Sequence, residues 1–168
     1  MRLTEPSPRY IESYKAALTE FERAGITGFW SAFEPIDDAQ SCVEHIKRYD
    51  HRTEVDGNAV PASVYWLVEG PEFIGHVSIR HTLSPALERL GGHIGYAIRP
   101  SKQGQGYGSR MLELALDKAK KLGIERVLVT CGRDNVASRK VIERNGGKLV
   151  DEDEVNGKPV LRFRIDLA

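Results

Sequence analysis

The sequence predicts a single α/β domain with a mixed sheet, and three observations lead to this fold class. Its 168 residues suit one domain that is large enough for a real core. Hydrophobic residues make up 40% and charged residues 29%, as in ordinary soluble globular proteins. Strand-like and helix-like segments are mixed along the chain, and strand–helix–strand units occur only in its middle.

The chain begins with a predicted short strand at residues 2–4, followed by a helix. Ser7 suits the N-cap of this helix, Pro8 suits its first position, and Gly25 suits its end. Its apolar residues fall on one face at helical spacing: Ile11, Tyr14, Leu18 and Phe21. This face is therefore expected to be buried.

A second helix is predicted to begin near Asp37 or Asp38 and to turn three residues inward: Val43, Ile46 and Tyr49. Residues 51–63 show no period and contain a glycine and a proline, which predicts a loop. Two strands are expected next, at residues 64–69 and 73–81, because a Gly-Pro pair between them favours a turn.

The second half of the chain has clearer boundaries. Residues 82–92 predict a connector with one helical turn, and residues 93–98 predict a strand that ends before a proline. Apolar residues at helical spacing predict a helix over 105–122, and the apolar run 126–131 is typical of a buried strand. A short helix is expected over about 135–145, because two glycines follow it.

The last twenty residues predict a hairpin over 148–167, because Asn156-Gly157 is a strong turn signal. The acidic run at 151–154 has two interpretations. It can attract a cationic amine, or it can be a solvated edge that resists aggregation. The second interpretation is favoured, because charged residues on a terminal edge usually have this role.

Composition excludes several function classes. Lys plus Arg equals Asp plus Glu at 24 each, so no net charge favours nucleic acid or anionic lipid. Cys42 and Cys131 are too few and too far apart for a disulfide framework or a zinc site. No apolar run approaches the ~20 residues of a membrane span, and the first residues lack a signal-peptide pattern. A cytoplasmic protein without a metal is therefore expected.

The segment "QGQGYGSRM" (103–111) joins a predicted strand to a predicted helix, an arrangement that binds anions through free N–H groups. A Walker loop needs Lys and Ser/Thr directly after its last glycine, and a dinucleotide loop needs a different glycine spacing. The pattern Q/R-x-x-G-x-G/A is satisfied by Gln103, Gly106 and Gly108. Pyrophosphate is the favoured ligand, and a tight turn with a cap is the alternative.

On these residues, and on "VLVTCGRDNVASRKVIERNGG", the sequence resembles the GNAT superfamily of acetyl-CoA-dependent N-acyltransferases from about residue 64 to 165. The resemblance implies a mostly antiparallel mixed sheet that splays open at an acetyl-CoA cleft, with flanking helices. It divides the single domain 1–168 into an N-terminal strand and two helices (1–50), a CoA-binding core (about 64–147) and the hairpin.

The resemblance also implies a set of cofactor-binding residues. The loop would bind the pyrophosphate through Gln103, Gly104, Gln105, Gly106, Tyr107, Gly108 and Ser109. The strand edge formed by Tyr96, Ala97 and Ile98 would pair with the pantetheine arm and direct an N–H at the thioester carbonyl. Asn135 and Ser138 would contact the same arm.

The catalytic groups depart from the family pattern. Many members carry a tyrosine, the acid for the leaving thiolate, at the position of Ile142 here. Either water or the amine's own proton replaces this acid, or a tyrosine from elsewhere does, and the motifs place Tyr96 and Tyr107 nearest. His93 is the preferred base, because a histidine pKa lies near neutrality, and relatives carry a carboxylate nearby. His76 and His81 come second, and for each histidine taken separately a local hydrogen-bonding role is the favoured interpretation.

The resulting function prediction is an N-acetyltransferase that uses acetyl-CoA and a primary amine in a ternary complex. A catalytically silent CoA-binding regulatory module and a protein that binds ATP or NAD are the alternatives. The acceptor stays open between small molecules and peptides, as do the acyl preference beyond acetyl and a homodimer. Trp30 and Phe33 are candidates for lining the acceptor cleft, or for core packing.

Overall fold

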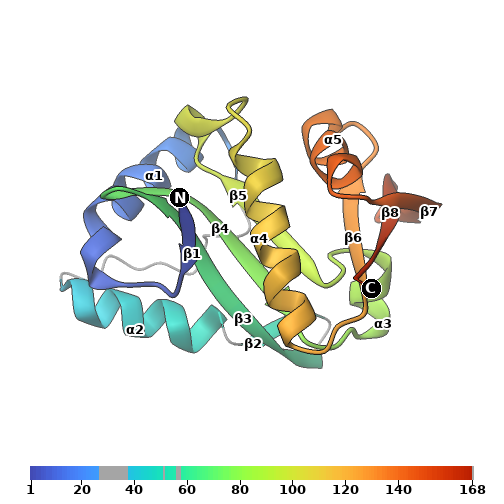
Figure 1. The fold of residues 1–168 in the computed structure, drawn as a ribbon, viewed down its shortest axis with the longest axis horizontal. Helices are drawn as coiled ribbons and strands as arrows, with labels where there is room; N and C mark the ends of the chain where they lie inside the picture. The colour runs from blue at the N-terminus through green and yellow to red at the C-terminus, as the bar shows by residue number, and fades with distance from the viewer. Residues whose placement is uncertain (27–37, 51, 56–57, 168) are drawn as a thin grey trace.

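The structure is a computed structural model that describes residues 1–26, 38–50, 52–55 and 58–167, and within it two antiparallel sheets lie side by side (Figure 1). The larger sheet has the order β1 (Arg2–Thr4), β3 (Asn58–Glu69), β4 (Glu72–Arg80) and β5 (Ile94–Ile98), with β2 (Arg52–Val55) also paired to β3. The smaller sheet has the order β6 (Arg126–Gly132), β8 (Lys158–Asp166) and β7 (Lys148–Val155). The α/β class and the divided sheet are thereby confirmed.

Helices cover both faces of the larger sheet. α1 (Ile11–Arg23) and α2 (Ala39–Asp50) lie on one face, and α4 (Tyr107–Lys121) crosses the other (Figure 1). α5 (Val136–Arg144) follows β6, and shorter turns complete the set: η1 (Pro8–Tyr10), α3 (Pro85–Arg89) and η2 (Pro100–Lys102). Within the described ranges, none of these helices has both the length and the apolar character that crossing a membrane requires.

The larger sheet is buried on both faces, so two cores hold the fold together. Under α4, apolar residues of both sheets form one continuous core that includes Val77, Met111 and Phe163. Under α1 and α2, Tyr14 stacks on Trp66 with ring centroids 4.5 Å apart, and Phe73 meets both rings edge-on. Because the first core includes residues from both sheets, α4 joins them through apolar burial.

The predicted helix ends and turns have clear physical causes in the structure. The Ser7 side chain caps η1 by accepting from Arg9 N, and Asp38 accepts from two N–H groups at the start of α2. Asn156 and Gly157 have φ of 53° and 73°, the left-handed conformation of a primed hairpin turn. These local signals were therefore sufficient to locate the elements they begin or end.

The predicted loop at 51–63 was wrong, because this segment contains β2 and the first part of β3. The two strands pair with each other in the register Thr53–Val60. Pro61 has no N–H to donate, but its carbonyl accepts from the main-chain N–H of His81 at 2.9 Å. The segment thus forms a hairpin within itself and also bonds to the residues around β4, which its local pattern does not indicate. The predicted cleft residues Trp30 and Phe33 lie outside the described residues.

One ion pair connects α1 to the chain that leaves β5. The Arg99 guanidinium lies 2.7 Å from Glu20 Oε1, and the Ser101 N–H donates to Glu20 Oε2 at 3.0 Å. Hydrogen bonding to the Arg99 side chain is the main cause that lowers the pKa of Glu20 from 4.5 to about 2. Because the pKa of Glu20 is lower in the folded than in the unfolded protein, its ionised carboxylate stabilises the fold at any pH above the unfolded-state value of 4.5. This stabilisation is lost as the pH falls toward the folded-state value of about 2.

Replacing Glu20 with glutamine is therefore expected to lower the free energy of unfolding at pH 7 by about 1 kcal/mol, because a partly exposed pair is screened by solvent. Between pH 4.5 and 2 the wild type should lose this advantage, so the two unfolding curves should converge. Urea denaturation at pH 7, 4 and 3 measures the difference. A gap that stays constant across this range would contradict the assignment.

Candidate functional site

The segment between β5 and α4 is a main-chain loop in an open conformation. Gly104 and Gly106 have φ of 74° and 86°, which glycine adopts without steric cost. Gly106 is the N-cap of α4 and provides no side-chain hydrogen bond, so the first N–H groups of the helix are left for an external acceptor. Two side-chain amides hold the loop in place. Gln103 Nε2 donates to the Ile98 carbonyl and Gln105 Nε2 donates to the Ser101 carbonyl, both at 3.1 Å.

The three glycines of the loop meet different surroundings. A Cβ added at Gly104 or Gly106 would contact no atom of the described residues within 4 Å. A Cβ at Gly108 would lie 3.1 Å from Val141 Cγ2 of α5. Gly104 and Gly106 thus keep the space above the loop open, whereas Gly108 allows α4 to pack closely against α5.

α5 is fixed at both ends by asparagine side chains. At its start, the Oδ1 of Asn135 accepts from the N–H of Ser138 at 3.0 Å, so this predicted ligand contact also works as a helix cap. At its end, the Nδ2 of Asn145 donates to the carbonyls of Ser109 at 3.1 Å and Val141 at 2.9 Å. The second of these asparagines therefore joins the start of α4 to the end of α5.

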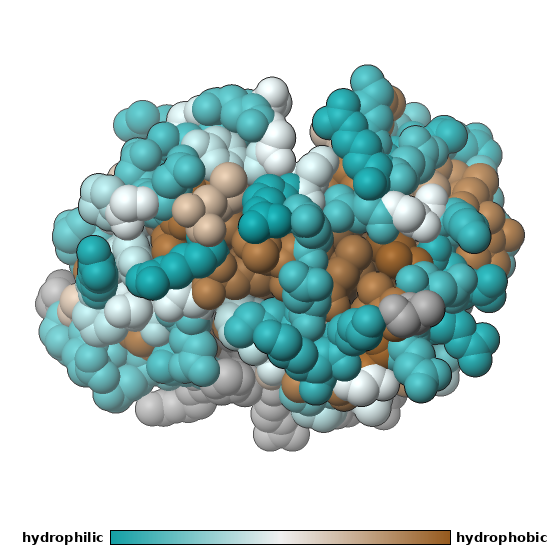
Figure 2. All heavy atoms as spheres, in the orientation of Figure 1, coloured by the Kyte–Doolittle hydropathy of each residue, from teal (hydrophilic) through white to brown (hydrophobic). Residues whose placement is uncertain are grey.

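A cleft of about 880 Å³ separates β5 and the glycine loop from α5. In Figure 2 it opens as a notch at the upper edge of the molecule, between the segment after β5 and α5. Ten of the predicted cofactor residues line it: Tyr96, Ala97, Ile98, Gln103, Gly104, Gly106, Gly108, Ser109, Asn135 and Ser138. The two motifs therefore meet across one space.

Two predicted residues are absent from this lining, and several others were missed. Gln105 and Tyr107 are not part of the lining, and the Tyr107 hydroxyl donates to Glu69 Oε2 at 2.6 Å instead. The missed residues include three cations: Lys102, Lys140 and Arg144. The sequence could have indicated two of them, because Lys140 and Arg144 are four residues apart and therefore lie on one face of a helix.

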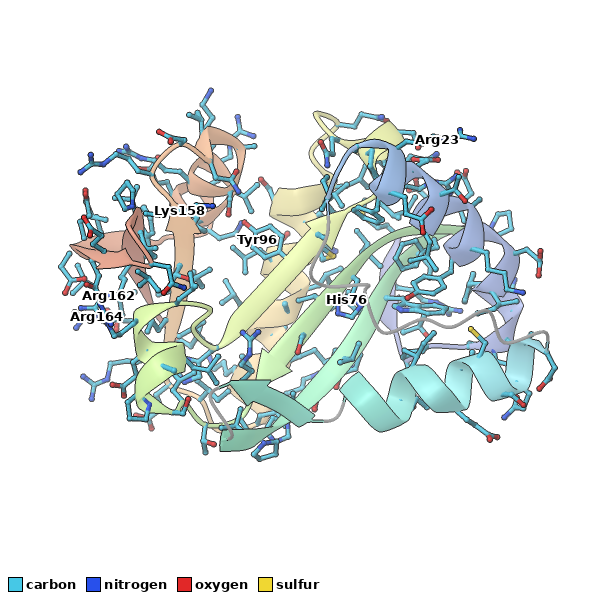
Figure 3. All side chains as sticks on the ribbon, turned by 180° about the vertical axis from the view of Figure 1, so that it is seen from behind. Arg23, His76, Tyr96, Lys158, Arg162 and Arg164 are labelled. Carbon is cyan, nitrogen blue, oxygen red and sulfur yellow. The ribbon has the colours of Figure 1, made fainter. Side chains whose placement is uncertain are left out.

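Tyr96 extends from β5 toward α5 and forms a hydrogen bond across the cleft. Its hydroxyl lies 2.9 Å from Ser138 Oγ, and Figure 3 shows the side chain in the space between the two sheets. Burial raises the pKa of Tyr96 to about 12, a shift that the Ser138 hydrogen bond opposes. The phenol is therefore protonated at neutral pH, and in this position it can donate a proton but not accept one.

The two sheets meet at one point and diverge from it. Gly92 forms a bridge to Val129, and the His93 N–H donates to the Leu128 carbonyl at 2.8 Å. A Cβ at Gly92 would lie 2.3 Å from that carbonyl oxygen, so the approach requires glycine. Beyond this junction, no described strand pairs with the outer edge of β5. The two sheets are therefore joined here by a single bridge, and no residue of this bridge is part of the cleft lining.

His93 takes part in this junction through its side chain as well. Its Nδ1 accepts from the main-chain N–H of Leu128 at 3.0 Å. Burial is the main cause that lowers the pKa of His93, and the charge of Arg80 adds to it. The imidazole is therefore neutral at neutral pH, but its lone pair is already bound to a main-chain N–H. His93 is not part of the cleft lining.

The other candidates for proton transfer lie away from the cleft lining. His76 is 3% exposed, and burial lowers its pKa to about 3. The Nε2 of His81 is 2.8 Å from Ser63 Oγ. Ile142 is fully buried in the core under α4, so this position does not face the cleft. In the part of the chain that the structure describes, no cluster of three potential metal ligands occurs.

Comparison with protein families gives one match over most of the chain. A profile described as an acetyltransferase (GNAT) domain matches residues 3–148. No curated protein matches the sequence closely enough to count as a relative.

Solved structures resemble the fold over nearly its whole length. The microcin C7 self-immunity acetyltransferase MccE, solved with acetyl-CoA and AMP, is 20% identical with a TM-score of 0.67, and the match covers 98% of this chain and 91% of that one. The ribosomal L7/L12 α-N-protein acetyltransferase RimL, solved with coenzyme A, is 19% identical with a TM-score of 0.65, covering 98% and 93%. Mycobacterium smegmatis RimJ, solved with CoA-disulfide, is 18% identical with a TM-score of 0.65, covering 98% and 80%.

Proposed function

The chain belongs to the GNAT acetyltransferase family, and on that premise we propose that it transfers an acetyl group from acetyl-CoA to a primary amine by direct attack in a ternary complex. The observation that carries the proposal is the cleft of about 880 Å³ that is lined by the glycine loop, the edge of β5 and α5. Its size is typical of a site for a small molecule or cofactor.

The cleft offers each part of acetyl-CoA a different partner. The free N–H groups at the start of α4, together with the positive end of its dipole, suit the pyrophosphate. Lys140 and Arg144 add positive charge to the same lining. The unpaired edge of β5 can bond the pantetheine amides as a neighbouring strand would. The acetyl-CoA and CoA in similar solved structures support this assignment.

The reaction requires three events at the thioester. The amine nitrogen attacks the thioester carbonyl, the C–S bond breaks, and the thiolate gains a proton while the amine loses one. An amine with a pKa of ~10.4 is neutral about once in 10³ at pH 7, so its deprotonation costs roughly 4–5 kcal/mol. A main-chain N–H on the free edge of β5 can polarise the carbonyl.

Tyr96 is the proposed acid for the leaving thiolate. Its hydroxyl points into the cleft and is protonated at neutral pH, because the pKa is raised to about 12. Ser138 positions this hydroxyl from the opposite wall. Tyr96 comes from a strand rather than from α5, where many family members carry their tyrosine.

Replacing Tyr96 with phenylalanine is expected to lower kcat by about 10²-fold, the lower end of the range for one general acid, and to leave KM for acetyl-CoA nearly unchanged. A raised pKa keeps the phenol protonated through neutral pH, so Tyr96 should cause no alkaline loss of activity below about pH 11. Steady-state kinetics from pH 6 to 10 measure both effects. Tyr107→Phe is the matched control, because its hydroxyl bonds Glu69 outside the cleft lining. An unchanged kcat in Tyr96→Phe would exclude the role.

A screen of primary amines with acetyl-CoA, measured by released thiol, tests the proposed function as a whole. Transfer to at least one amine, with acetylated product confirmed by mass, is the expected result. Binding of CoA without transfer to any amine would favour a silent regulatory module. Stabilisation by ATP but not by CoA would favour a nucleotide-binding protein.

A further inference from the structure

The cleft has a second wall, on the side of β5 that faces α1. Tyr96 and Ile98 pack against the core under α4, whereas Ala97 between them packs against the core under α1 and α2. All three residues line the cleft, and so does Phe21 of α1, which belongs to that second core. The cleft therefore reaches past the edge of β5 to both faces of the larger sheet.

The end of α1 fixes the position of Ile26, the third residue of this wall. Gly25 has φ of 66°, and its N–H donates to the Glu22 carbonyl at 3.0 Å. The Ile26 N–H donates to the Phe21 carbonyl, also at 3.0 Å. These bonds form a Schellman motif, in which the apolar side chains at the two ends of the second bond typically meet. Ile26 remains 38% exposed, so its side chain is accessible to a ligand.

Charge is distributed unevenly around the cleft. The charged residues of the described lining are all cations: Lys102, Lys140 and Arg144. No carboxylate of the described residues is part of the lining, and Glu20 of α1 is already paired with Arg99 at 2.7 Å. Among the described residues, the wall on the α1 side thus offers an acceptor apolar contact but no counter-ion for an ammonium group.

We propose that the acceptor is a monoamine with an apolar body, which packs against Ala97, Phe21 and Ile26. This inference rests on the proposed function. Acetyl-CoA would occupy the glycine loop and the free edge of β5, so the α1 side is the part of the lining left for the acceptor. Ala97 directly follows Tyr96, the proposed acid for the leaving thiolate, so an amine on this wall is close to the thioester. Alkylamines are the simplest members of this substrate class.

The test compares three acceptors of similar length: hexylamine, 6-amino-1-hexanol and 1,6-diaminohexane. All three present the same reacting amine and differ only at the far end. For the wild type, kcat/KM for hexylamine should exceed that for the alcohol by about tenfold and that for the diamine by on the order of 10²-fold. The reason is that an apolar wall leaves a hydroxyl unbonded and a second charge unpaired.

Ile26→Asp adds a carboxylate to this wall, so the ratio of hexylamine to diamine should fall from about 10² to about 1. Leu122→Asp is the matched control, because Leu122 is 42% exposed at the end of another helix, α4, and is not part of the cleft lining. The control should keep the wild-type ratio. Each ratio is measured within one preparation, so partial misfolding of a variant does not affect it.

Equal rates for the three acceptors in the wild type, or a preference for the diamine, would overturn the inference and leave the proposed function intact. Transfer to another amine of the screen without transfer to hexylamine would do the same. An acceptor ratio that Ile26→Asp leaves unchanged also contradicts the inference, and a changed preference between acetyl-CoA and hexanoyl-CoA in that variant would then assign the wall to the acyl chain. Absence of transfer to any amine despite a CoA-induced thermal shift would overturn the proposed function itself.

Discussion

Acetyl-CoA at a hundredfold excess over its Kd is expected to stabilise the wild-type protein by about 2.7 kcal/mol, and Gly106→Val is expected to remove this stabilisation. A ligand that binds only the folded state produces such a shift by mass action. The side chain of valine would enter the open space above the loop, where no described atom lies within 4 Å and where the pyrophosphate is proposed to bind. Differential scanning fluorimetry with and without acetyl-CoA measures the effect.

Gly123→Val is the matched control for this experiment. Gly123 has φ of 80° and an equally open environment, but it follows the other end of α4. Both variants carry the same strain of a left-handed residue, about 1–2 kcal/mol, so both should melt earlier than the wild type. Gly123→Val should keep the full acetyl-CoA shift. If Gly106→Val keeps it too, the pyrophosphate does not bind at this loop.

His93→Ala is expected to lower kcat/KM by about 10²-fold, whereas His93→Asn should retain most of the activity. The reason is the hydrogen bond from Leu128 N–H to Nδ1, which occupies the lone pair that a base needs. On this geometry we propose that His93 is a positioning residue that holds the junction, rather than the predicted base. The asparagine Oδ1 takes nearly the same place as Nδ1 and can accept the same bond.

The pH dependence of kcat/KM separates the two roles. A base must be unprotonated, and the pKa of His93 is lowered, so a base role would produce an acidic limb below pH 6.5 in the wild type. That limb would be lost in His93→Asn together with the activity. If His93→Asn is as inactive as His93→Ala and the limb is absent from both, His93 is the base and the positioning role is wrong.

The glycine loop could be predicted because its structure depends on local chemistry. Left-handed φ at Gly104 and Gly106, the cap at Asn135 and the hairpin turn at Asn156 each follow from residues a few positions apart. Tyr96 could be placed at the cleft because the family resemblance located its strand beside the cofactor. The sequence was informative wherever neighbours in the chain determine the conformation.

Features that depend on distant partners could not be predicted in the same way. Gly108 is small because Val141 of another helix packs against it. The bond between His93 and Leu128 joins residues 35 positions apart, and no local pattern marks it.

α5 forms one wall of the cleft, and its attachment to the rest of the protein is slight. Ile142 is the one buried residue of this helix, all of which is described; Val141 packs against the core at the side of Gly108, and Asn145 and Ser138 add hydrogen bonds. Local unfolding of this helix should therefore need far less free energy than global unfolding, and its amides should exchange with solvent early. A bound cofactor that bridges α4 and α5 would slow that exchange, so the protein would become more rigid as it becomes ready to react. At the position where many family members carry a tyrosine, Ile142 thus stabilises α5 through its buried side chain, and so keeps this side of the cleft in place between turnovers.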